Sequence, residues 1–165
     1  MHTDYLYFII KVIHLGSLIA WLGPTLGAWW MLRLANRQFG EPSMISQFLY
    51  VSFLHLLRVE HFAFVLLLIS GAGMVWLSPA LPQPWLWFKL MLLLVIIIPV
   101  ELFDIWFSHY KLPGVFAARH PSRPYSKQES ALLHDYHQRF VPTALILLPP
   151  TILSVFWLAI YKPMW

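Results

Sequence analysis

The stretch WLWFKLMLLLVIIIPV, residues 85–100, decides the fold of this chain and carries one charged side chain, that of Lys89. A helix needs about 20 predominantly apolar residues to cross the hydrocarbon of a bilayer, where every backbone amide must be bonded within its own segment. Stretches of the same character recur along the chain. The sequence therefore predicts one all-α domain over residues 1–165, a four-transmembrane-helix bundle with spans at about 5–33, 43–77, 85–109 and 129–161.

The composition agrees with a lipid environment. Hydrophobic residues make up 59% of the chain and charged residues 11%, a balance that would cover a soluble domain of this size with apolar surface. The net charge of +4 would suggest nucleic acid in a soluble protein, but the basic residues lie in connections and at helix ends, so we expect the lipid bilayer and no nucleic acid as partner. The chain has no cysteine, which excludes disulfides, thiolate metal sites and iron–sulfur clusters.

The basic residues also predict the orientation in the membrane. Positively charged side chains favour cytoplasmic connections. Arg33 and Arg37 flank the first connection, the second has no Lys or Arg, and the third, a loop expected at about 111–127, holds Lys111, Arg119, Arg123 and Lys127. Both termini are therefore expected on the non-cytoplasmic side.

Small residues recur at helical spacing in the first span, at Gly16, Ala20, Gly23 and Gly27. The pair Gly23 and Gly27 is a GxxxG motif, which permits close approach of two helix backbones. This face indicates either compact packing within the bundle or a homodimer contact, with clearance for a cofactor as the other interpretation. Prolines could kink the spans and open cavities between them, at Pro24, Pro99, Pro142, Pro149 and Pro150.

Ionisable side chains inside the spans are functional candidates, because charge is costly at membrane depth. At about 1.5 Å per residue, His14 lies roughly 15 Å from the outer end of its helix, and His61 and Glu101 each lie roughly 25 Å in. Arg58 and Asp104 lie about one turn deeper. Helices two and three are therefore expected to share a polar layer on the cytoplasmic side.

A pair of histidines from two helices is a common way to hold heme in a bundle. His14 and His61 are the candidates for binding the cofactor and its metal. Their depths differ by roughly 10 Å, so kinks, tilts or a different partner for His14 would be needed. The alternative for both histidines is a polar packing or hydrogen-bonding role.

The other polar residues of the layer allow two interpretations. Arg58, Glu60, Glu101 and Asp104 could form a structural layer of ion pairs. Alternatively, Arg58 anchors a propionate or other carboxylate while Glu101 or Asp104 transfers protons released in an oxidation. Lys89, near the outer interface, either extends its ammonium group to water or contacts an anionic ligand group.

His134 and His137, three residues apart, could share a metal with His109 or His120. Their interfacial position favours a solvated face instead. The six methionines do not form a cluster with copper spacing, and we find no hydrolase triad, phosphate loop or dinucleotide motif.

A series of short motifs carries a family resemblance. In order along the chain they are Lys11-Val-Ile-His14-Leu-Gly16, Leu22-Gly23, Gly27-Ala28, Ala35-Asn36-Arg37, Ser70-Gly71 and Tyr161-Lys162-Pro163. Over nearly its whole length the chain resembles an uncharacterised bacterial family of four-helix integral membrane proteins, a domain of unknown function. That family is similar to the HemJ-type protoporphyrinogen oxidases and, more remotely, to CopD-like membrane proteins.

The HemJ-type pattern falls on Lys11 and His14, on Arg58, on Trp85-Leu86-Trp87-Phe88-Lys89 and on Lys162-Pro163. The resemblance implies a multi-pass protein of the bacterial inner membrane that binds heme b and oxidises protoporphyrinogen, with a porphyrin as ligand. However, the HemJ type carries histidine near the inner end of its third helix, where this chain has Glu101-Leu-Phe-Asp104. The second hypothesis is therefore a non-enzymatic accessory subunit, or a small-solute or metal-handling protein, whose buried charges are structural.

Overall fold

The computed structural model describes residues 2–40, 43–77, 83–116 and 123–163. Every regular element in these ranges is helical, which confirms the all-α class. Four helical stretches are long and apolar enough to cross a membrane, and they coincide with the four predicted spans: Asp4–Phe39, Met44–Leu77, Pro84–Phe116 and Lys127–Tyr161. Many large apolar side chains remain exposed on these helices, as expected for surfaces that face lipid.

The first span consists of two helices, α1 (His2–Leu22) and α2 (Pro24–Phe39), which are interrupted at Gly23. Pro24 is the first residue of α2, a position that tolerates the missing backbone donor. A Cβ atom on Gly23 would lie 3.0 Å from the carbonyl oxygen of Ile19, a tighter approach than most real Cβ contacts, so glycine suits this position. The kink expected from Pro24 is thus a break between two helices.

The second span, α3 (Met44–Leu77), packs along both α1 and α2. The glycines that permit this approach are on α3: a Cβ on Gly71 would lie 3.2 Å from the His14 ring, and one on Gly73 would lie 3.5 Å from the Ile10 side chain. A Cβ on Gly16 or Gly27 would meet no atom within 4 Å among the described residues. Of the predicted small-residue face, Gly16 and Gly27 are therefore open among the described residues, whereas Ala20 packs against the buried cluster around Trp21 and Phe64.

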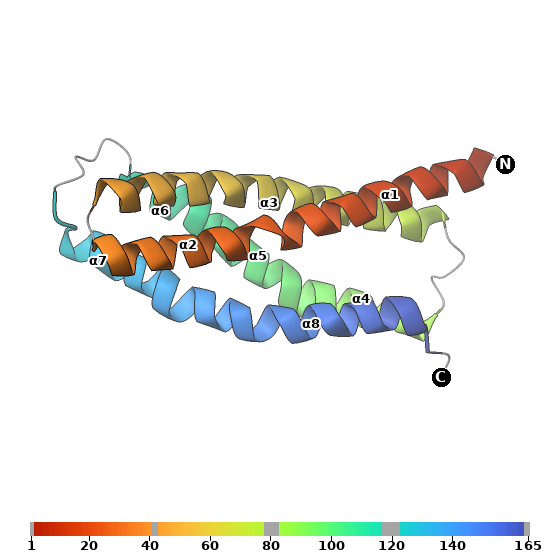
Figure 1. Ribbon diagram of the computed structural model, residues 1–165. Coiled ribbons are helices and arrows are strands. Elements are labelled where there is room, and N and C mark those ends of the chain that lie inside the picture. Colours follow the sequence, from red (N-terminus) through yellow and green to blue (C-terminus); the bar gives the residue numbers. More distant parts are fainter. Residues whose placement is uncertain (1, 41–42, 78–82, 117–122, 164–165) are drawn as a thin grey trace.

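The third span crosses the bundle from one neighbour to another (Figure 1). It runs through α4 (Pro84–Leu92), η1 (Leu93–Ile97), α5 (Ile98–Ile105), η2 (Trp106–Lys111) and α6 (Leu112–Phe116). Its beginning packs against α8, and its last part packs against α3. The helix continues to Phe116, beyond the predicted end at 109, because Leu112, Val115 and Phe116 are buried against the other helices.

The fourth span contains α7 (Lys127–His134), η3 (Asp135–Phe140) and α8 (Val141–Tyr161). It begins with a capping box, in which the Ser126 hydroxyl accepts from the Glu129 backbone N–H and the Glu129 carboxylate accepts from that of Ser126. The segments η1, η2 and η3 are π-helical turns, and the proline after η1 or η3 lies within the first two residues of the next helix. A widened turn accommodates a residue without a backbone donor, so the spans continue through Pro99 and Pro142.

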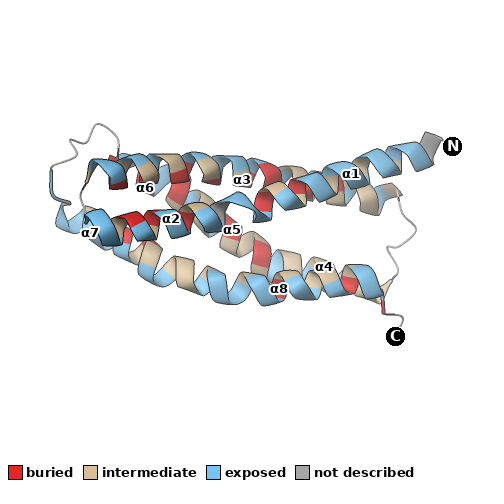
Figure 2. Ribbon diagram, in the orientation of Figure 1, coloured by how far each residue is buried: buried red, intermediate tan, exposed pale blue. Residues whose placement is uncertain are grey.

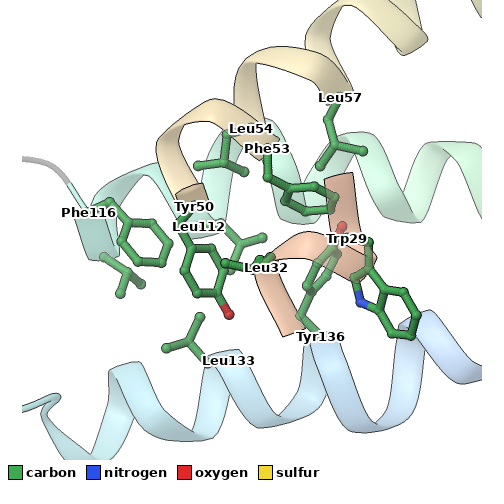
Figure 3. Close-up of a cluster of buried hydrophobic side chains, with 11 residues drawn as sticks. Trp29, Leu32, Tyr50, Phe53, Leu54, Leu57, Leu112, Phe116, Leu133 and Tyr136 are labelled. Atoms are coloured by element: carbon green, nitrogen blue, oxygen red, sulfur yellow. The ribbon is translucent and has the colours of Figure 1, made fainter. Parts of the chain in front are cut away.

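Both termini lie at one end of the bundle, here called the termini end, and the opposite end is called the loop end (Figure 1). A cluster of buried side chains occupies the loop end (Figure 3), whereas the termini end is more exposed (Figure 2). A smaller cluster around Trp21, Phe64 and Ile97 fills the middle. The loop end is therefore the more tightly packed half of the bundle. Its buried side chains are called the loop-end cluster: Trp29, Leu32, Tyr50, Phe53, Leu54, Leu57, Leu112, Val115, Phe116, Leu133 and Tyr136.

Candidate functional site: a polar network beside a cavity

His61 lies at the centre of a polar network that joins the second and third spans. Its ring is buried, with 4% of its surface exposed. Its Nδ1 lies 3.0 Å from Nε2 of His109, and its Nε2 lies 3.1 Å from Oδ2 of Asp104. Since both ring nitrogens are bonded within the protein, His61 could bind a metal only if one of these bonds broke.

Asp104 receives a second bond from the fourth span. The Tyr136 hydroxyl donates to Oδ1 of Asp104 over 2.9 Å, and the tyrosine is almost completely buried. Phe107 and Phe140 pack against the Tyr136 ring, with centroids 5.5 and 5.7 Å away. Both carboxylate oxygens of Asp104 are thus bonded, and three spans contribute to one network.

Glu101, one turn before Asp104, is buried and only partly bonded. Its Oε1 accepts from Nε1 of Trp21 over 3.1 Å, whereas its Oε2 has no partner. Nε1 of Trp29 is the other buried polar atom that has no partner among the described residues. An unpaired buried polar atom costs about 1–3 kcal/mol, so these two atoms mark a place where a ligand or water could bind.

A cavity of about 210 Å³ adjoins these groups. All four spans line it, and Glu101, Asp104, Glu60 and Trp29 provide polar atoms in an otherwise apolar wall. Its rim contains exposed apolar side chains, Leu22 and Leu26 on one side and Leu145 on the other. The cavity therefore opens toward the lipid-facing surface between the first and fourth spans.

His14 lies apart from this network. Its Nδ1 lies 3.1 Å from both the carbonyl oxygen of Leu67 and the hydroxyl of Ser70, and its ring rests on Gly71. No described residue bonds to its Nε2. A metal-binding histidine commonly donates its other ring N–H to a carbonyl in this way, so His14 has the arrangement of a ligand with one nitrogen available.

The remaining predicted residues lie in different surroundings. Lys89 is partly buried and lies close enough to His14 for an electrostatic interaction with its ring. Arg58 is exposed and, in the described part of the chain, makes no ion pair with Glu101 or Asp104. It lies close enough to His109 for an electrostatic interaction with that ring. Of the residues expected in this layer, His61 and Asp104 are bonded to each other, and Arg58 is not bonded to Glu101 or Asp104 among the described residues. Two residues of the HemJ-type sequence pattern are in contact, since the Lys162 ammonium lies 5.7 Å from the centre of the Trp85 ring.

The second histidine group does not assemble a metal centre. His134 is exposed, and His137 is bonded to the Tyr50 hydroxyl. His120 lies outside the described residues. Within the described ranges, no three His, Cys, Asp or Glu side chains are placed to hold a metal ion.

Sequence reasoning missed three members of the network: Trp21, Tyr136 and, in this role, His109. Tyrosine and tryptophan are common in membrane helices and carry no charge, so a search for buried charge does not select them. Their positions along the first and fourth spans do give a signal, because Trp21 and Tyr136 carry hydrogen-bond donors at about the same depth as Glu101 and Asp104. His109 was counted with the loop, because the third span was expected to end there.

Comparison of the chain with family models, with curated proteins and with solved structures gave no match. The functional argument therefore depends on the geometry of the network, the cavity and His14.

Proposed function

We propose that the chain is a HemJ-like integral membrane oxidoreductase that removes electrons and protons from an apolar substrate of the tetrapyrrole class. One observation carries the proposal: Glu101 and Asp104 line a cavity that opens toward lipid, and Asp104 is connected through buried His61 to exposed His109. An oxidation that releases protons in a low-dielectric site requires a base at the substrate and a path to water. The network contains both.

The cavity suits the edge of a molecule that dissolves in the membrane. Its apolar wall would contact a hydrocarbon framework, while the unpaired Oε2 of Glu101 would accept a hydrogen bond from a substrate N–H. Nε1–H of Trp29 would donate to an acceptor on the same molecule. Pyrrole N–H groups are donors of the required kind. Because the cavity is smaller than a whole macrocycle, a tetrapyrrole would insert one edge and leave the rest between the first and fourth spans.

The proton path follows from two arrangements of the same hydrogen bonds. In one, protonated Asp104 donates to Nε2 of His61, and Nδ1–H of His61 donates to Nε2 of His109. In the other, Nε2–H of His61 donates to ionised Asp104, and Nε2–H of His109 donates to Nδ1 of His61. The change from the first to the second moves one proton from Asp104 to His109, which can release it to water.

Heme b, implied by the resemblance, fits His14 and does not fit His61. Nδ1 of His14 is held by the Leu67 carbonyl and Nε2 is available, whereas both nitrogens of His61 are bonded. Bound heme would supply an acceptor that takes one electron at a time. Along the helix, His14 lies about 10 Å from Trp21 at the cavity wall. Lys89 is the cation placed near His14 for a propionate.

The proposal includes the orientation and location. The bias of Lys and Arg supports a cytoplasmic loop end and non-cytoplasmic termini in a bacterial inner membrane. His109, two residues before Lys111, would then release protons on the cytoplasmic side. The homodimer expected from Gly16, Ala20, Gly23 and Gly27 is compatible with this arrangement, because a Cβ on Gly16 or Gly27 meets no atom within 4 Å among the described residues.

The first experiment is an absorption spectrum of the detergent-purified protein, oxidised and then reduced, with iron measured on the same sample. We expect heme bands that His14→Ala removes. Protoporphyrinogen oxidation, followed by porphyrin fluorescence, should fall about 100-fold or more in Glu101→Gln and Asp104→Asn. Asp135→Asn is the matched control, since Asp135 pairs with Arg139 at the surface. Full turnover by both cavity variants would refute the site.

The cavity volume favours a second candidate, a non-enzymatic protein that handles a small solute. A cavity of about 210 Å³ would enclose a small amine completely, with Glu60, Glu101 and Asp104 as acceptors. This candidate predicts a colourless, iron-free protein whose tryptophan fluorescence changes when a small amine is added. The change should disappear in Glu101→Gln and persist in Asp135→Asn.

A further inference from the structure

A second cavity, of about 470 Å³, lies at the loop end between α2 and the fourth span. It is separate from the cavity beside Glu101 and has a different character. Arg33 and Arg37 line it from α2, and His134 and His137 line it from α7 and η3. Amide and hydroxyl groups, including that of Asn36, complete the wall. Cations and hydrogen-bond donors thus converge on one hollow.

No carboxylate of the described residues lines this hollow. Two described acidic side chains that flank it in sequence, those of Glu129 and Asp135, are bonded elsewhere. Oε2 of Glu129 accepts from the Ser126 backbone N–H over 2.6 Å, and Asp135 pairs with Arg139 over 2.9 Å. Within the described ranges, neither Arg33 nor Arg37 forms an ion pair with the protein. Among the described residues, no carboxylate therefore neutralises the positive charge of the cavity.

Aromatic residues of the loop-end cluster hold Arg33 and His137 in place. The Arg33 guanidinium lies 4.9 Å from the centre of the Trp29 ring, which belongs to the loop-end cluster. His137 is bonded to the Tyr50 hydroxyl, and the Tyr50 ring stacks on Phe116 at 4.5 Å. Arg33 and Arg37 lie four residues apart on α2 and both line the cavity, so their like charges repel one another unless an anion lies between them. The site is thus preorganised for an anion.

We propose that this cavity binds a phosphate group. Arginine presents N–H donors in a planar fork that matches phosphate oxygens, and such charge-assisted bonds are about twice as strong as neutral ones. Two sources offer the same chemistry at this place. One is the headgroup of an anionic phospholipid, since basic pockets between membrane helices on the cytoplasmic side bind such headgroups. The other is a soluble phosphate compound.

The test compares the wild type with Arg33→Gln/Arg37→Gln. The matched control, Lys111→Gln/Lys127→Gln, removes the same charge at the same end, and neither residue lines the cavity. Protein from vesicles of phosphatidylcholine with a minor fraction of phosphatidylglycerol is extracted and its retained lipid identified by native mass spectrometry. In parallel, inorganic phosphate is titrated in neutral detergent against the unfolding temperature, with chloride as reference.

We expect anion binding in the wild type and the control, and binding about tenfold weaker or more in the double arginine variant. Retention of phosphatidylglycerol without a phosphate effect identifies a headgroup site, and the converse identifies a soluble ligand. Asn36→Asp provides a second variant that keeps both arginines and the acceptor for Ser46 but adds a negative charge, and it should also weaken binding. Absence of both effects in the wild type, or equal loss in the control, would overturn the proposal.

Discussion

Replacing Tyr136 with Phe should destabilise the bundle by about 2 kcal/mol without changing its packing. The substitution removes one hydroxyl, which donates to Asp104 over 2.9 Å. The ring contacts with Phe107 and Phe140 remain, because they involve only the aromatic carbons. The loss therefore isolates one hydrogen bond between the third and fourth spans.

The magnitude follows from the surroundings of Asp104. A hydrogen bond to a charged group contributes about 1.5–3 kcal/mol. The Asp104 side chain is 14% exposed and lines the cavity beside Glu101, so water can replace part of the lost interaction. Its other oxygen keeps the bond to His61. These facts favour the lower half of the range, about 1.5–2 kcal/mol.

The assay is reversible unfolding in mixed micelles, titrated with sodium dodecyl sulfate and followed by tryptophan fluorescence and circular dichroism. The variants are Tyr136→Phe, Asp104→Asn and their combination, which together form a double-mutant cycle. Tyr110→Phe is the control, because Tyr110 is 75% exposed. We expect no change in the control and a coupling of about 1 kcal/mol or more between Tyr136 and Asp104. Stability within about 0.5 kcal/mol of wild type for Tyr136→Phe, or strict additivity, would refute the network described here.

Three further predictions concern the helices. Gly71→Leu should displace the His14 ring, because even a Cβ would lie 3.2 Å from it; heme absorbance should be lost, whereas Gly73→Ala, with its Cβ at 3.5 Å from Ile10, should retain it. Gly16→Ala and Gly27→Ala should leave the free energy of unfolding of the monomer within about 0.5 kcal/mol of wild type. If cross-linking or sedimentation finds a dimer in the wild type and a monomer in these variants, this face contacts a second copy. Ser126→Ala should lower stability by about 1 kcal/mol in the detergent titration, since it removes the cap from α7, and an unchanged midpoint would contradict the capping box.

The spans could be predicted from the sequence, because a membrane crossing requires a long apolar run and such runs are visible in composition alone. The end of the third span could not. Pro113 and Gly114 are typical of a loop, but Leu112 and Phe116 on either side pack into the loop-end cluster and keep the helix intact. Tertiary packing overrides local propensity at this point.

The polar layer was predicted in part. Lipid penalises isolated charge, so Glu101, Asp104 and His61 were expected to lie together, and they do. Arg58 was expected with them, but it is exposed. Leu57 and His61 are four residues apart on the buried face of α3, and Arg58 is turned about 100° from Leu57 around the helix. Helical register decides this difference, and depth alone does not indicate it.

The position of the Glu101 cavity follows from how the two halves of the bundle are packed. On its loop-end side, Asp104, His61 and Tyr136 are fixed by hydrogen bonds and by the loop-end cluster. On the opposite side, the helices that form its wall are irregular: α1 ends at Leu22, before the break at Gly23, and Pro149 lacks a backbone donor within α8. Under the proposed function, a substrate would enter near the break at Gly23 of the first span and Pro149 of the fourth, away from the bond between Tyr136 and Asp104. Fixed groups that transfer protons would then lie beside a less regular entrance, an arrangement that suits a substrate dissolved in the membrane.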